Sequence, residues 1–220
     1  MTHGLEVWGD YACFTRPELK VERVSYPVIT PSAARGIFDA IFWAPGLRWQ
    51  IQRIEILNPI RDFSLRRNEI KAKAPYPQEI LSWAQNRSQP QPILTSDPDE
   101  GHTLRLTRGL RDVRYRLHAT LHGPDPSTTK SADRQFQRRA RKGQCHHQPY
   151  LGCREFVAYF HPATDTPPHP FDLDIGLMLY DIFGLDGAPS PSLFRATVKQ
   201  GVLEVPAYDS DLVLKPCSTI

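Results

Sequence analysis

Residues 133–156 read DRQFQRRARKGQCHHQPYLGCREF, a basic helical pattern followed by a glycine-bounded loop. The cations of this stretch are Arg134, Arg138, Arg139, Arg141 and Lys142. Gly143 ends the helical pattern, and His146 and His147 follow before the chain becomes strand-like near residue 155. A basic helix beside imidazoles can hold a polyanion over groups that transfer protons. We therefore predict a nucleic-acid site here, of the kind that cleaves RNA.

The charge distribution supports a polyanionic partner more than the net charge does. The chain has 220 residues, 40% of them hydrophobic and 23% charged, as in ordinary globular proteins, and its formal net charge is only +3. Between residues 105 and 142, however, eleven Arg or Lys residues face three acids. A basic middle is typical of a nucleic-acid-binding surface. A solvated face without a partner is the alternative reading.

Cysteine spacing and hydropathy argue against several other classes. The four cysteines form no CxxC pair, so a zinc ribbon is not predicted. Cys145, His146 and His147 are consecutive, and adjacent residues rarely converge on one ion, so we predict no metal and no cofactor. The N-terminus lacks an apolar signal core, and no apolar run approaches the roughly 20 residues that span a bilayer. We expect a cytoplasmic protein without a membrane partner.

The first elements are a strand, a helix and a second strand. Residues 4–14 favour a strand with a bulge or kink near Gly9. Thr30 and Pro31 are a good N-cap and first helical residue, and apolar residues then recur at helical spacing through 43. Residues 47–60 form the next predicted strand. Residues 71–103 contain five prolines and predict a long excursion with a short helix at 78–86, which is either a disordered insertion or a nucleic-acid lid.

Residues 107–122 predict a strand with one apolar face and one basic, hydrogen-bonding face. The basic face is either a platform for RNA or simply exposed to solvent. A loop at 125–130, the basic helix at 132–141 and a strand at 152–160 complete the order strand, helix, strand, strand, helix, strand. That order predicts an α+β, ferredoxin-like (βαββαβ) domain over residues 1–162. A proline-rich linker then leads to a small antiparallel β-sheet domain at 163–220, with a hairpin turn at 199–201.

Several strings resemble one known family. They are GDYACFTRPELKVERVSYPVITPSAARGIFDAIFW, RIEILNPI with RRNE, and RKGQCHHQPYLGCREF. Together they are similar to the CRISPR-associated family-five protein of subtype I-C, also called the Dvulg subtype, over most of residues 4–160. The resemblance implies a ferredoxin-like domain with a small β domain, and metal-independent cleavage of CRISPR repeat RNA. It also implies that the guide RNA stays bound among the other subunits of a type I-C surveillance complex.

The family is described with a tyrosine near the end of the first helix and a Lys-His pair before the basic helix. This sequence has Phe42 at the tyrosine position, and the pair falls near Ser131 and Ala132, one step after Lys130. The resemblance therefore does not supply a complete set of catalytic residues.

Metal-free RNA cleavage needs a base for the attacking 2′-hydroxyl, a proton for the leaving oxygen and positive charge for the phosphate. We predict that one of the paired histidines, His147 rather than His146, does the acid–base work and that Lys130 stabilises charge. The alternative is that the histidines only hydrogen-bond within the loop. Tyr26 and Tyr150 are further candidates for the missing hydroxyl. The predicted nucleic-acid-binding residues are Arg35, Arg66, Arg67, Arg134, Arg138, Arg139, Arg141 and Lys142.

Three functions stay open from the sequence. The first is an endoribonuclease that processes precursor CRISPR RNA. The second is a catalytically silent subunit that binds the 5′ end of the guide RNA, which the missing tyrosine and Lys-His pair would favour. The third, compatible with either, is non-specific double-stranded DNA binding through the arginines.

Overall fold

The computed structural model describes residues 2–90, 94–97, 99, 101–184 and 189–216. The chain forms two compact units, one of residues 1–63 and 108–220 and the other of residues 64–107. The second unit contains the excursion predicted at 71–103, of which residues 91–93, 98 and 100 lie outside the described part, as does Cys217. The predicted boundary between residues 162 and 163 falls within the first unit and stays a prediction about domains.

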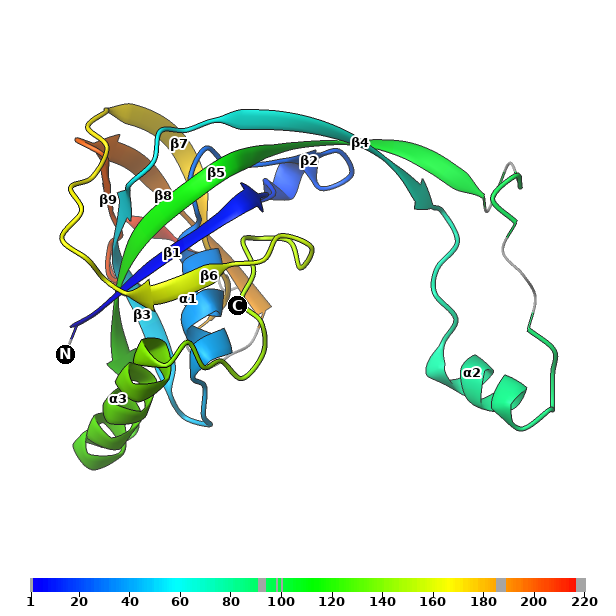
Figure 1. The fold of residues 1–220 in the computed structure, drawn as a ribbon, viewed down its shortest axis with the longest axis horizontal. Helices are drawn as coiled ribbons and strands as arrows, with labels where there is room; N and C mark the ends of the chain where they lie inside the picture. The colour runs from blue at the N-terminus through cyan, green and yellow to red at the C-terminus, as the bar shows by residue number, and fades with distance from the viewer. Residues whose placement is uncertain (1, 91–93, 98, 100, 185–188, 217–220) are drawn as a thin grey trace. The chain divides into compact units, whose positions relative to one another are not determined.

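The architecture is mixed α/β and is built on one large antiparallel sheet (Figure 1). The main strand order is β10-β8-β9-β3-β5-β1-β6, while β2 and β4 pair with β5 and β7 pairs with β8. The strands are β1 (Thr2–Ala12), β2 (Arg23–Val24), β3 (Arg48–Ile56), β4 (Asp62–Ile70), β5 (His102–His122), β6 (Tyr159–Pro162), β7 (Leu173–Phe183), β8 (Pro189–Lys199), β9 (Val202–Glu204) and β10 (Val213–Leu214). The helices of the described residues are α1 (Pro31–Ile41), α2 (Pro77–Ala84), α3 (Pro126–Arg141) and the short 3-10 helix η1 (Pro17–Leu19).

Helix α1 confirms the prediction at its first residue. The Thr30 hydroxyl accepts a hydrogen bond from the amide of Ala33 at 3.2 Å, and Pro31 takes the first helical position. Ile37, Phe38 and the other apolar positions of the pattern are buried against the sheet. The cap and the apolar period therefore both act as the sequence indicates.

Helix α3 begins six residues earlier than predicted. Asp125 is its N-cap, because its carboxylate accepts from the amides of Ser127 and Thr128 at 2.9 Å each, and Pro126 starts the helix. The expected loop at 125–130 is therefore wrong, and Lys130 lies within the second turn of α3. The helix ends where expected, with Lys142 as C-cap and Gly143 at φ +62.

Aromatic rings join the two helices to the sheet. Phe136 of α3 stacks on Phe38 of α1 with ring centroids 5.3 Å apart, and lies 4.6 Å from Trp49 of β3. His3 of β1 packs edge-on against Phe136 and accepts or donates a 2.6 Å hydrogen bond with Asp133. Deeply buried rings of this kind contribute a large share of core stability. This cluster fixes α3 against α1 and β1.

The strand predicted at 152–160 is wrong for most of its length, because β6 begins only at Tyr159. Residues 143–158 form a loop held by its own backbone bonds. The Leu151 amide donates to the carbonyl of Phe156 at 2.7 Å. The Leu151 carbonyl accepts from the amide of Cys13, the residue that follows β1, at 3.0 Å. Gly152 has φ +83, and a Cβ there would lie 2.1 Å from Cys13 O, so only glycine fits.

The C-terminal strands form as predicted and join the same sheet. The chain turns at Gln200 and Gly201, both with positive φ, between β8 and β9. β9 then pairs with β3 through Arg53, Ile54 and Glu55. The positive φ of both turn residues matches a two-residue hairpin.

The predicted apolar face is confirmed at the alternating positions 113–121, whereas before residue 113 the buried position shifts to Leu110. The basic face is neither an open platform nor free in solvent along its whole length. Arg116 is 8% exposed and donates to Glu55 at 2.8 Å and to the carbonyls of Thr164 and Thr166. The proline-rich connection after β6 thus covers this end of the sheet.

Glu6 of β1 lies under the same connection. Burial opposes ionisation of its carboxyl group, but hydrogen bonds from Thr164 and Arg114 hold its pKa below the ordinary value.

The second unit contains a short helix near the predicted position. α2 spans Pro77–Ala84, and the amide of Tyr76 donates to the Glu79 carboxylate at 2.7 Å at its start. None of its residues is buried. Among the helices of the described residues, none has the length and apolar content to cross a membrane.

Candidate nucleic-acid interface

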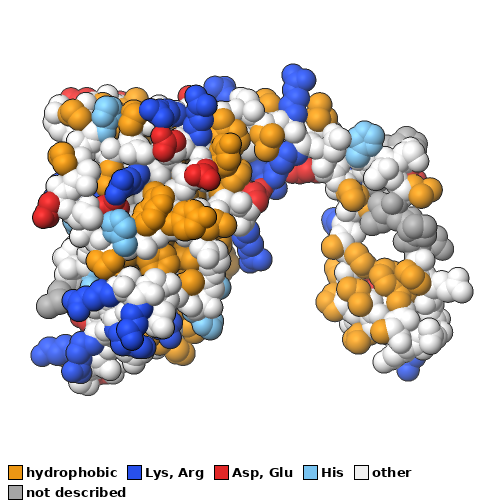
Figure 2. Space-filling model, in the orientation of Figure 1, with side chains coloured by type: hydrophobic (Ala, Val, Ile, Leu, Met, Phe, Trp, Pro, Cys, Tyr) orange, Lys and Arg blue, Asp and Glu red, His pale blue; other side chains and the backbone are white. Residues whose placement is uncertain are grey.

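The exposed face of α3 carries a cation stripe, which we define as Lys130, Arg134, Arg138 and Arg141. These positions are spaced by four, four and three residues, so they fall on one side of the helix. The residues of the opposite side are buried, among them Ala132, Phe136 and Ala140. The stripe extends about 16 Å along the helix at 1.5 Å per residue. Figure 2 shows Lys and Arg side chains gathered over this helix.

The stripe has no acidic partner among the residues that the structure describes. Asp133 is the only acid within α3, and its side chain is turned inward to His3. In the described part of the chain, the four stripe residues take part in no ion pair. The positive side chains of the last turn also interact favourably with the helix dipole.

The C-terminal end of α1 holds the histidine loop. The amides of His146 and His147 both donate to the carbonyl of Ala40, at 2.7 and 3.3 Å. Arg139 donates to the next carbonyl, that of Ile41, at 2.9 Å, and its guanidinium lies 5.4 Å from the centre of the Phe42 ring. These contacts satisfy carbonyls that a helix end leaves unpaired.

The same contacts leave both imidazoles exposed, with ring centroids 6.0 Å apart. The structure therefore brings together His146, His147, Arg139 and Phe42. Arg139 faces Phe42 rather than the stripe, so its role is to fix the loop as well as to add charge.

Lys130 is not beside the histidines. It is nine residues before Arg139 on the same helix, or about 14 Å along the axis. Its surroundings are a depression of about 450 Å³ that is also lined by His122, Asp125 and Asp133. Lys130 and the histidines therefore belong to separate places on the surface.

Neither Phe42 nor Tyr26 offers an accessible hydroxyl. Phe42 is 8% exposed, and its carbonyl accepts from the Trp49 indole at 3.1 Å. Tyr26 is 1% exposed, and burial raises the pKa of its phenol. Its oxygen accepts from the amide of Leu179, which places it in the core. Tyr150 is half-buried in the loop.

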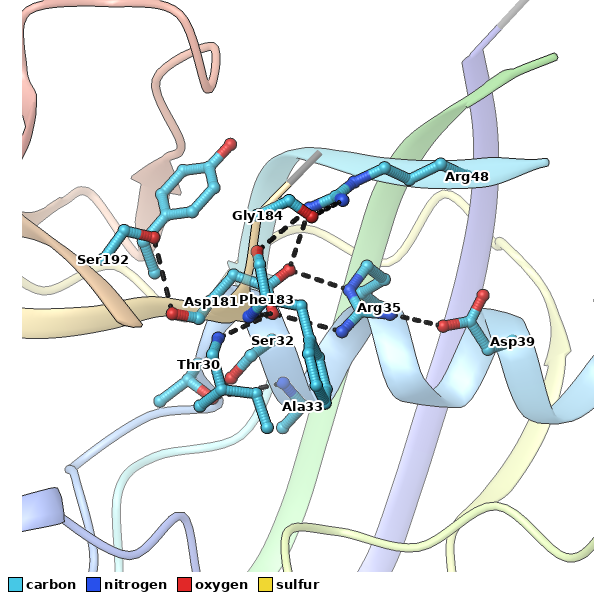
Figure 3. A network of polar contacts seen from close by, with 12 residues as sticks. Thr30, Ser32, Ala33, Arg35, Asp39, Arg48, Asp181, Phe183, Gly184 and Ser192 are labelled. Atoms are coloured by element: carbon cyan, nitrogen blue, oxygen red, sulfur yellow. Dashed lines mark hydrogen bonds and ion pairs between the residues drawn. The ribbon is translucent and has the colours of Figure 1, made fainter. Parts of the chain in front are cut away.

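Arg35 lies in an internal ion network shown in Figure 3. Its guanidinium donates to Asp181 at 2.9 and 3.1 Å and to Asp39 at 2.7 Å. Arg48 reaches the same Asp181 at 3.4 Å. Asp181 is 3% exposed, so this network ties α1 and β3 to β7. Burial raises the pKa of Asp39 even though Arg35 favours its ionised form.

Sequence reasoning missed this network, although Asp181 is the only acid in the apolar run 177–183. A lone acid in a buried strand needs a cationic partner. The network borders a cavity of about 300 Å³ that Tyr180 and Tyr208 also line. The role of Arg35 as a nucleic-acid contact stays a prediction.

Two predicted binding residues belong to the second unit. Arg66 is exposed on β4, and Arg67 pairs with Glu69 at 3.0 Å. Across the described residues, no three His, Cys, Asp or Glu side chains converge as a metal site would require.

The sequence and the fold of this chain are both similar to those of known proteins. Residues 4–206 match the family model described as CRISPR-associated protein (Cas_Cas5). A Mannheimia succiniciproducens protein named CRISPR pre-crRNA endoribonuclease Cas5d is 45% identical over 222 residues, 95% of this chain and 96% of the relative. A Thermus thermophilus protein of the same name is 40% identical over 226 residues, covering 92% and 90% of the two chains. A crystal structure described as a CRISPR-associated protein shares the fold, with a TM-score of 0.67 at 20% identity over 97% of this chain and 96% of its own.

Proposed function

Because this chain belongs to the Cas5d family of CRISPR-associated proteins, we propose that it is an endoribonuclease that cleaves precursor CRISPR RNA within the repeat. The observation that carries the proposal is the uncompensated cation stripe on α3, whose C-terminal end leads directly into the loop with two exposed imidazoles. The two relatives described above, 45% and 40% identical to this chain over 95% and 92% of its length, are named for that activity. Charge along the helix binds the strand, and the loop supplies proton-transfer groups.

We also propose that β1, α1, β3, β5, α3 and β6 form a ferredoxin-like domain. Their order along the chain is βαββαβ, and their order in the sheet is β6-β1-β5-β3 with antiparallel neighbours. In this domain, residues 64–107 of the second unit are an insertion that begins within β4 and ends within β5. Residues 163–220 supply the strands that extend the sheet beyond β3, which supports reading them as an added β domain.

The proposed chemistry is attack of the RNA 2′-hydroxyl on the adjacent phosphate. His147 removes the hydroxyl proton or donates one to the leaving 5′ oxygen, with His146 as the second imidazole. Their backbone amides are fixed on Ala40, so the side chains are presented at a defined place while remaining open to a ligand. The products are a 2′,3′-cyclic phosphate and a free 5′-hydroxyl, and no metal ion enters this scheme.

Cations stabilise the bound RNA in this proposal. Arg138 and Arg141 lie at the loop end of the stripe and are placed for phosphates next to the cut. Lys130, about 14 Å away along α3, neutralises a phosphate farther along the same strand. Arg134 lies between them. The proposed partners are CRISPR repeat RNA and the other subunits of a type I-C surveillance complex.

Phe42 favours one competing function. It places a buried ring without a hydroxyl where the family resemblance implies a tyrosine, as expected of a silent subunit that binds the guide RNA 5′ end. The cation stripe would serve that function equally, and it would also serve non-specific binding of double-stranded DNA.

An RNA cleavage assay in EDTA separates these functions. Purified protein is incubated with repeat RNA, and the fragments are analysed for their 3′ ends. A single cut that leaves a 2′,3′-cyclic phosphate supports the endoribonuclease. RNA that stays intact while tightly bound supports the silent subunit and rejects cleavage. Competition by double-stranded DNA of unrelated sequence measures the third function in the same samples.

A further inference from the structure

We propose that a second surface of the first unit binds an unpaired segment of RNA by stacking its bases on the exposed rings of Tyr11 and Tyr159, which the half-buried ring of Trp8 supports. We call this surface the aromatic strip and define it as Trp8, Tyr11 and Tyr159, with Arg111 beside them. It lies on the opposite face of β1 from Leu5 and Val7, which are buried in the core with α1 and α3. The proposal rests on the proposed function in taking RNA as the ligand.

Two rings of the strip are already stacked across neighbouring strands. Trp8 of β1 is the register partner of Tyr159 of β6, and their ring centroids are 6.0 Å apart with planes inclined by 29°. Tyr159 is 54% exposed, so a large part of its ring surface is not buried by the protein itself, in contrast to most aromatic rings. His161, two residues along β6 from Tyr159, also packs against the Trp8 ring, with ring centroids 4.9 Å apart. The free side of Tyr159 is therefore a preformed stacking surface.

A change of face along β1 adds a third ring. Leu5, Val7 and Gly9 are buried, but the buried position then moves to Ala12, and Tyr11 is 49% exposed. The antiparallel register with β5 is the same on both sides of this point. The change therefore puts Tyr11 on the same face as Trp8, about 10 Å farther along the strand. β1 itself is continuous from Thr2 to Ala12 and its pairing with β5 contains no bulge at Gly9, whereas Asp112 of β5 has a positive φ of 55.

Arginines lie directly opposite both β1 rings on β5. Trp8 pairs in register with Arg114, and Tyr11 pairs with Arg111. Arg114 is neutralised by the buried carboxylate of Glu6, so it supports the surface rather than binding phosphate. Arg111 is exposed, and its side chain has no ion-pair partner among the described residues. One free cation beside separated rings matches a single strand, whose bases stack while its phosphates meet positive charge.

The rest of this face is closed, which defines the strip's extent. Thr164 donates to Glu6 at 2.5 Å, and Arg116 donates to the carbonyls of Thr164 and Thr166. The connection after β6 therefore covers the sheet up to Glu6 and stops before Trp8. Tyr11 is backed by Phe63 at 4.9 Å, so its ring is supported without being covered. Duplex RNA hides its bases in stacked pairs, so the strip should prefer unpaired nucleotides.

Fluorescence anisotropy with a labelled 12-nucleotide oligouridylate and a 12-base-pair RNA duplex tests the proposal. We expect Tyr159→Ala and Tyr11→Ala each to weaken oligouridylate binding about tenfold, within the range found for loss of one base–aromatic stack. Tyr159→Phe keeps the ring and should bind within about twofold of the wild type. Duplex binding should not change in any of these variants. Arg111→Gln should reduce the salt slope for oligouridylate by about 0.7.

Unchanged oligouridylate binding by both alanine variants would overturn the proposal. So would an equal loss for single strand and duplex, because stacking cannot cause it. If Tyr159→Ala binds oligouridylate normally but no longer associates with another subunit, the strip is a protein contact instead. Cleavage of repeat RNA is measured separately. Binding that depends on the strip, without any cleavage, rejects the proposed function and keeps this inference. Cleavage together with binding that does not depend on the strip keeps the proposed function and rejects this inference.

Discussion

Removing charge from the cation stripe should change how RNA binding depends on salt. We consider the triple variant Arg134→Gln, Arg138→Gln and Arg141→Gln. Each side chain is exposed and has no ion-pair partner among the described residues, so each is free to release a counterion from RNA. At about 0.7 counterions per phosphate of a single strand, the slope of log affinity against log salt should fall by about 2.

That slope sets the size of the effect. Four stripe cations alone imply about a 50-fold loss of affinity between 50 and 200 mM salt, and the one remaining in the variant implies about a threefold loss. Glutamine has nearly the helix propensity of arginine, so α3 should stay folded. Circular dichroism melting of the variant checks that its fold is unchanged.

Binding is best measured with repeat RNA that carries 2′-O-methyl groups, which block attack by the 2′ oxygen and keep the ligand intact. Arg195→Gln is the matched control, because Arg195 is exposed on β8 and already paired with Asp174 at 2.7 Å. It makes the same Arg-to-Gln change once and should leave the slope within the error of the wild type, whereas each of the three stripe changes should lower it by about 0.7. If the triple variant keeps the wild-type slope, or the control lowers the slope by about 0.7 as one RNA-contacting cation would, the stripe is not the specific RNA contact.

Three further predictions concern the framework of the site. Phe136→Ala should lower the free energy of unfolding by about 3–5 kcal/mol in urea titrations, because the ring fills the space between α1, α3 and β3; a loss under about 1 kcal/mol would contradict this packing. Asp181→Asn should cost about 3 kcal/mol, since it leaves Arg35 and Arg48 without their shared carboxylate, and a stability equal to the wild type would show that the network is unimportant. The pKa of Glu6 is lowered in the fold, so its contribution is complete above the ordinary value of 4.5 and is lost as pH falls through the lower folded-state pKa. The stability difference between wild type and Glu6→Gln should therefore shrink below about pH 5, and a constant difference down to about pH 2 would refute the assignment.

Local signals predicted the elements whose ends are decided locally. Thr30 and Pro31 start α1 because a cap and a fixed φ act within one turn. Asp125 and Pro126 carry the same signature at the start of α3, and the polar residues after them obscured it. The alternation of residues 113–121 located the buried face of β5, because burial follows side-chain parity.

Features that depend on distant partners could not be predicted in this way. Residues 152–158 have strand-like composition, but the amides of Phe156 and Ala158 bond to carbonyls within the same loop, which no local pattern reveals. Arg116 belongs to a basic face in the sequence and is covered by the connection at 163–166 only in the folded chain. The distance of Lys130 from the histidines likewise follows from the true start of α3. Arg134, Arg138 and Arg141 of the stripe could be read from the sequence because their spacing is helical, but Lys130 was placed in a loop.

The measurement that tests the central claim most directly is the single-turnover cleavage rate of repeat RNA in EDTA by the wild type and by His147→Asn. Asparagine keeps the amide that donates to Ala40 and a polar side chain, but cannot transfer a proton near neutral pH. We predict that the wild type cuts the repeat once and leaves a 2′,3′-cyclic phosphate. The variant should be at least about 100-fold slower while its affinity for the RNA changes less than about twofold. Intact RNA with the wild type would contradict the proposed activity, and equal rates for the two proteins would contradict the assigned site.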